Sequence, residues 1–71
     1  MSSNLPQGII LNGEKRLVSS QTVSCLLNEL DLSGKKVAVE KNREIVSRDS
    51  YQDTLVESGD QIEIIQFVGG G

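Results

Sequence analysis

The sequence predicts one small α+β domain, in which a single main helix covers a mixed sheet of four to five strands. Short apolar runs rich in β-branched residues alternate with turn signals, and one segment has apolar residues at helical spacing. The length of 71 residues is near the lower limit for folding on one hydrophobic core without metals or disulfides. We therefore expect one domain over residues 1–71, with a frayed lead at residues 1–7 and a flexible glycine tail at residues 69–71.

Composition argues against several classes of function. The chain has no histidine and one cysteine, Cys25, so we expect no histidine-based catalytic site, internal disulfide or cysteine-cluster metal site. Every charged residue from Asp49 onward is acidic, which disfavours nucleic acid as a partner. No segment resembles a membrane span or a signal peptide, so we expect a cytoplasmic protein with no membrane partner.

The first half of the chain predicts a hairpin followed by a helix. The apolar runs at residues 9–11 and 16–18 flank Asn12-Gly13, a pair that tolerates positive φ in a tight turn. Thr22 can cap a helix through its hydroxyl group, and Ser33-Gly34 is expected to end that helix. The apolar stripe of the helix recurs at i, i+3, i+4 and i+7: Val23, Leu26, Leu27 and Leu30.

The second half predicts three further strands. Residues 37–40 and 45–46 are interpreted as strands joined by a turn with Asn42 at positive φ. Residues 49–56 are ambiguous, and a single helical turn carrying Tyr51 and Leu55 is one interpretation.

After a turn at Gly59-Asp60, residues 61–68 form the clearest strand. It directs Ile62 and Ile64 to one face and Ile65 and Phe67 to the other. The order of two strands, a helix, two strands, a turn and a strand is that of the ubiquitin-like β-grasp fold.

The end of the chain is the main candidate for chemistry. Gly69-Gly70-Gly71 directly follows the apolar strand, and a segment without side chains can pass through a narrow channel. The terminal carboxylate of Gly71 is ionised at neutral pH and becomes reactive only when a partner enzyme adenylates it. The chain itself lacks a phosphate-binding glycine loop, so it would be the substrate of that enzyme. A flexible tail without function, or a cloning remnant, is the alternative interpretation.

Nearly the whole chain, from Ile10 to Gly71, resembles the ThiS family of sulfur carriers for thiamin thiazole biosynthesis. The resemblance rests on ordered segments, and two positions depart from the common pattern: Ser47, where many relatives have proline, and Tyr51, where many have tryptophan. The matching segments are Leu11-Asn12-Gly13-Glu14, Thr22-Val23, Leu26-Leu27, Val37 to Glu40, Ile45-Val46, Arg48, Tyr51, Gly59-Asp60, Ile62 to Ile64 and Val68 to Gly71.

The resemblance implies a carrier that is not itself an enzyme and binds no cofactor or metal. A ThiF-like adenylyltransferase, related to ubiquitin-activating enzymes, would use ATP to adenylate Gly71. A persulfide would then supply sulfur to form a thiocarboxylate, and a ThiG-like thiazole synthase would accept that sulfur. Same-fold carriers for molybdopterin, cysteine or methionine synthesis, or for tRNA thiolation, are alternatives, as is a ubiquitin-like interaction module.

Three further candidates come from the residues themselves. Ile65, Phe67 and Val68 are expected to form a partner surface beside the tail if the N-terminal segment or the Tyr51 turn does not cover them. Cys25 is more readily interpreted as an ordinary thiol on the far side of the helix than as a redox or persulfide site. An acidic helical face is a weak cation-site candidate and more readily a solvated surface: Asp49, Asp53 and Glu57.

Overall fold

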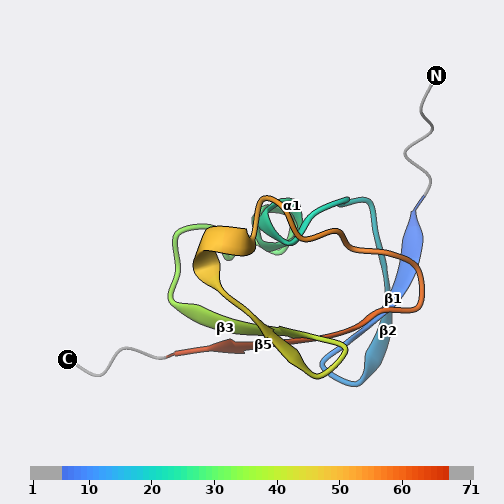
Figure 1. Cartoon of the computed structure of the whole chain (residues 1–71). Helices are drawn as coiled ribbons and strands as arrows, with labels where there is room; N and C mark the ends of the chain where they lie inside the picture. Colours follow the sequence, from blue (N-terminus) through green and yellow to red (C-terminus); the bar gives the residue numbers. More distant parts are fainter. Residues whose placement is uncertain (1–5, 68–71) are drawn as a thin grey trace.

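The computed structural model describes residues 6–67 and contains a five-stranded mixed sheet with one α-helix on one face (Figure 1). The strands lie in the order β2-β1-β5-β3-β4, and among the strand pairs of the described residues only β1–β5 is parallel. This is the β-grasp topology that the sequence predicts. No helix within residues 6–67 is long and apolar enough to cross a membrane.

The first hairpin consists of β1 (Gln7–Leu11) and β2 (Glu14–Val18). Asn12 and Gly13 have φ values of 50° and 85°, as expected for their turn. Frayed residues were predicted as far as Gln7, and this is wrong for Gln7 itself. Gln7 pairs with Val18, and its side-chain amide donates to the carbonyls of Ser20 and Val56 at 3.1 and 3.0 Å. Residues 1–5 lie outside the described part of the chain.

The helix α1 spans Val23–Glu29. Its N-cap is Thr22, as predicted: the hydroxyl oxygen accepts the amide proton of Cys25 at 3.1 Å. The predicted end at Ser33-Gly34 is wrong, because Asp31 already takes positive φ (63°) and the amide of Leu32 donates to the Leu27 carbonyl at 2.7 Å. An aspartate therefore occupies the C-terminal position at which glycine is usual.

The second hairpin consists of β3 (Val37–Lys41) and β4 (Glu44–Val46), and Asn42 has the positive φ expected of it, at 51°. A 3₁₀ turn, η1 (Arg48–Ser50), follows. The helical turn considered for this region does not reach Leu55, which instead forms an isolated bridge with Thr22.

The core lies between α1 and the sheet. Of the predicted helical stripe, Leu26 and Val23 are fully buried and Leu27 is nearly so. The strand β5 (Gln61–Gln66) lies at the centre of the sheet and contributes Ile62 and Ile64 to the core. Within residues 6–67, the buried apolar side chains are Ile9, Val18, Val23, Leu26, Leu27, Val39, Val56, Ile62 and Ile64.

Candidate functional site

The predicted site begins at the end of β5, the central strand. Beyond Gln66, the backbone amide of Phe67 still donates to the carbonyl of Lys36 at 3.0 Å, which holds β5 beside the start of β3. Figure 1 shows β5 running beside β3 in the sheet, which lies below α1 in this view. The predicted site residues Val68, Gly69, Gly70 and Gly71 lie outside the described residues, so the predictions about them remain predictions.

Ile65 and Phe67 are exposed on the sheet face opposite α1. Their exposed fractions are 55% and 57%, whereas Ile62 and Ile64, on the other face of β5, are 0% and 7% exposed. The Tyr51 turn does not cover them, because Tyr51 packs against the core. The exposure expected of these two side chains is therefore confirmed, and their role as a partner surface stays a prediction.

The register of the sheet adds apolar residues to this surface that the sequence analysis did not identify. Ala38 lies directly opposite Ile65, and Ile45, which is 81% exposed, lies opposite Glu40. Leu17, opposite Gly8 on the first hairpin, is 70% exposed. We call this face of the sheet, on which Leu17, Ile45, Ile65 and Phe67 are exposed, the open face; Leu17 lies level with the start of β5, at the opposite end from Phe67. The alternation of side chains between the two sheet faces could have identified Leu17 and Ile45 as exposed. Both strands are too short for that pattern to be clear in the sequence, and their register is set only by pairing with neighbouring strands.

The start of β5 is held by a polar network around Asp60, which is 8% exposed. One carboxylate oxygen of Asp60 accepts the amide proton of Glu57 at 2.8 Å and lies 3.7 Å from the Lys41 ammonium group. Lys41 also donates to the carbonyl of Leu55 at 2.7 Å. Every buried side-chain polar atom in the described residues has a hydrogen-bond partner, and the bonds around Asp60 stabilise the turn before β5.

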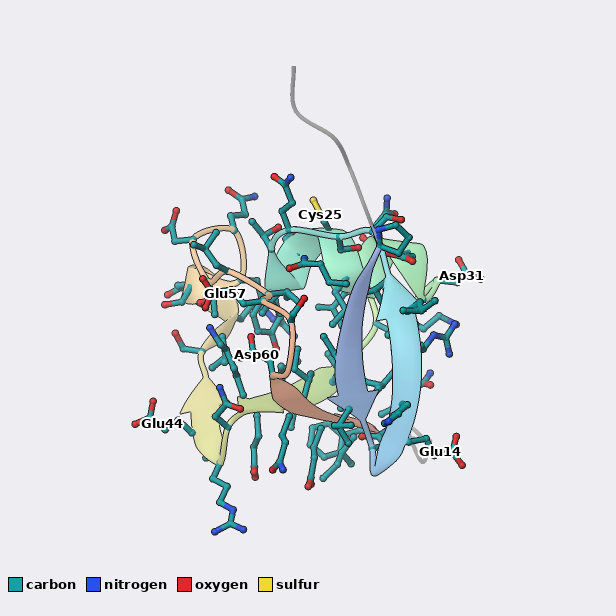
Figure 2. All side chains as sticks on the ribbon, turned by 90° about the vertical axis from the view of Figure 1, so that its right-hand side faces the viewer. Glu14, Cys25, Asp31, Glu44, Glu57 and Asp60 are labelled. Atoms are coloured by element: carbon teal, nitrogen blue, oxygen red, sulfur yellow. The ribbon has the colours of Figure 1, made fainter. Side chains whose placement is uncertain are left out.

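The remaining candidates are separate from the open face. Cys25 is exposed, and Figure 2 shows its sulfur on the outer side of α1, away from the sheet. The acidic helical face is wrong, because Asp49 lies in η1 whereas Asp53 and Glu57 follow it in non-helical chain. Within residues 6–67, no group of three or more potential ligands could hold a metal ion.

Comparisons with known proteins place this arrangement in a family. The ThiS family model matches residues 9–71. The sulfur carrier protein ThiS of Bacillus subtilis is 40% identical over 63 residues, covering 86% of this chain and 96% of that protein. The crystal structure of the thiamine biosynthesis protein (ThiS) from Geobacter metallireducens has a TM-score of 0.77 and 32% identity, and covers 92% of this chain and 100% of that one.

A longer relative is more similar in sequence over the matching segment. A thiazole synthase of Paramagnetospirillum magneticum is 50% identical over 64 residues, which are 89% of this chain. This chain spans only 20% of the length of that protein, and the same share of a second thiazole synthase, from Magnetococcus marinus.

Proposed function

This chain belongs to the ThiS family, and we propose that it carries sulfur for formation of the thiazole ring of thiamin. The carboxylate of Gly71 is the group that carries the sulfur. Two observations support this assignment: the family match extends to Gly71, and the relative from Bacillus subtilis, named a sulfur carrier, aligns over almost its whole length. The chain acts as a carrier and is not itself an enzyme.

The chemistry at Gly71 requires an activation step, because a carboxylate is a poor electrophile. A ThiF-like adenylyltransferase transfers AMP from ATP to the carboxylate, forming a mixed anhydride and releasing pyrophosphate. The terminal sulfur of a persulfide attacks the carbonyl carbon and AMP leaves. A second thiol then reduces the resulting sulfur–sulfur bond, which leaves a thiocarboxylate on Gly71 and a disulfide on the donor side. ATP belongs to the partner enzyme in this scheme, and this chain binds no cofactor.

The open face supplies the partner surface. Ile65 and Phe67 place exposed apolar area directly before the tail, and Ile45 is exposed on the same face of the sheet, in the row of Glu40 and Glu63. Apolar side chains concentrated on one face commonly mark protein-binding surfaces. A partner that docks here is in position to receive the residues that follow Phe67, including Val68.

The thiazole pathway is favoured by one observation in particular. Among the relatives described above, the one with the highest sequence identity to this chain is named thiazole synthase, and this chain matches a segment of it. A ThiG-like thiazole synthase is therefore the proposed acceptor of the sulfur. In that relative, a segment similar to this chain is part of the same polypeptide as the synthase, which raises the effective concentration of each for the other.

An intact-mass experiment tests the proposal. The protein is incubated with its host's ThiF-like enzyme, ATP and a persulfide donor with a reducing thiol. A mass gain that matches replacement of one oxygen by sulfur, localised to Gly71, is expected. A chain without Gly71 is the control and should keep its mass while melting at the same temperature as the full chain.

A second step identifies the pathway. Sulfur transfer from the charged protein to thiazole synthase is compared with transfer to the large subunit of molybdopterin synthase. Exclusive transfer to the latter would move the chain to another pathway. Failure of thiocarboxylate formation with an active enzyme would favour a ubiquitin-like interaction module.

A further inference from the structure

The strand that leads to the tail loses its strand neighbour on one side before it ends. The parallel pairing of β1 with β5 ends at Leu11 and Ile62, because the chain turns into the first hairpin at Asn12-Gly13. On the other side, β3 accompanies β5 as far as the pair Val37–Gln66. Without a substitute for β1, the last residues of β5 would have a free edge on the β1 side.

The side chain of Asn12 provides that substitute. Its backbone amide donates to the Ile62 carbonyl at 2.9 Å, which completes the regular ladder. Its side-chain Oδ1 then accepts the amide proton of Ile64 at 2.8 Å, and its Nδ2 donates to the Ile64 carbonyl at 3.2 Å. The side-chain amide thus pairs with both backbone polar groups of Ile64, as the next residues of a continued β1 would.

Asparagine suits both the backbone conformation and the hydrogen bonding at this position. The φ of 50° lies in the left-handed region, which asparagine and glycine tolerate better than most residues. A carboxamide presents one donor and one acceptor side by side, whereas aspartate offers only acceptors and glycine offers neither. The turn alone would be satisfied by glycine, so the pairing with Ile64 gives a separate reason for the amide.

Asn42 makes a similar set of bonds at the opposite end of the same strand. Its backbone amide donates to the Gln61 carbonyl at 2.7 Å, and its Oδ1 accepts the amide proton of Gln61 at 2.9 Å. Its Nδ2 donates to Asp60 at 3.1 Å, and its φ is 51°. Asn42 and Asn12 therefore stabilise the fold through equivalent bonds, but only Asn12 acts near the end from which the tail leaves.

We propose that Asn12 is a positioning residue for the activation of Gly71: it orders the β1-side edge of β5 from Ile64 to Phe67, the segment that precedes the tail and that the adenylating enzyme contacts. The inference rests on the proposed carrier function. Loss of the Asn12 amide removes both hydrogen bonds to Ile64 on the β1 side, whereas β3 still pairs with β5 on the other side. The partner must then restore the order of this edge on binding.

The matched variants Asn12→Gly and Asn42→Gly test the proposal. Each keeps the positive φ and removes two side-chain hydrogen bonds to or beside β5. Both should melt at similarly lowered temperatures, and activity is measured well below both melting points. Hydrogen exchange of the Ile64 amide should accelerate in Asn12→Gly, and that of the Gln61 amide in Asn42→Gly.

The decisive measurement is adenylation by the ThiF-like enzyme as a function of carrier concentration. Asn12→Gly should lower kcat/KM about 5- to 30-fold, mainly through a higher KM. This fold-change corresponds to the conformational entropy lost when the partner orders roughly one residue on binding. Asn42→Gly should match the unaltered protein. Asn12→Asp, which keeps the acceptor for the Ile64 amide, should recover part of the loss.

The outcomes separate the two proposals. Equal kcat/KM for the two glycine variants, or losses that follow their melting temperatures, would show that Asn12 acts on stability alone and would overturn the inference while the carrier function stands. Absence of adenylation in the unaltered protein would overturn the carrier function and with it the role of Asn12.

Discussion

Ile64 and Ile65 are neighbours of the same type on opposite faces of β5, so replacing each by alanine separates the core from the open face. Ile64 is 7% exposed, and truncating a buried isoleucine costs about 2–5 kcal/mol. Ile65 is 55% exposed, so about 45% of its surface is buried and its truncation should cost roughly 1 kcal/mol. The whole domain of 71 residues is expected to have a stability of about 4–10 kcal/mol. Ile64→Ala should therefore remove a large part of that stability.

Thermal denaturation and calorimetric binding give the two readouts. At about 4–8 °C per kcal/mol for a domain of this size, Ile64→Ala should melt at least about 8 °C lower, and Ile65→Ala about 4–8 °C lower. Under folding conditions, Ile65→Ala should bind the ThiF-like enzyme more weakly, while the folded fraction of Ile64→Ala should bind normally. Equal destabilisation by the two changes, with unaltered binding by Ile65→Ala, would refute the assignment of the two faces.

Three other changes have defined outcomes. Gly70→Val should block thiocarboxylate formation at an unchanged melting temperature, because a branched side chain obstructs passage through a narrow channel; normal charging in the mass assay would contradict this. Phe67→Asp should weaken partner binding with little effect on unfolding, since Phe67 is 57% exposed, and a large loss in a melting curve would place it in the core instead. Thr22→Ala should lower the free energy of unfolding by about 1 kcal/mol through loss of the N-cap bond to Cys25, whereas Thr22→Ser should retain most of it.

Local patterns in the sequence predict most of this fold. The hairpin turn at Asn12-Gly13, the Thr22 cap and the two faces of β5 each depend on a few adjacent residues, and the structure confirms them. The end of α1 was misplaced because Asp31 takes the conformation for which glycine is the usual signal. Gln7 was misassigned because its hydrogen bonds to Ser20 and Val56 depend on the tertiary fold.

The candidate site was predictable only in part. Ile65 and Phe67 follow from alternation along one strand, but the contributions of Ile45 and Leu17 depend on which strands are neighbours. The contact of Asn12 with Ile64 joins residues 52 positions apart. In the sequence, Asn12 has a sufficient explanation as a turn residue, and its second role becomes visible only when β1 and β5 are paired.

The central place of β5 also has a consequence during synthesis. β5 leaves the ribosome after the other described elements, yet it lies between β1 and β3 and joins the two hairpins into one sheet. Before β5 inserts, no strand joins the two hairpins, and the core lacks the part supplied by Ile62 and Ile64. An incompletely folded chain therefore cannot present its end from an ordered strand, so an activating enzyme that requires the sheet surface would discriminate against immature carriers.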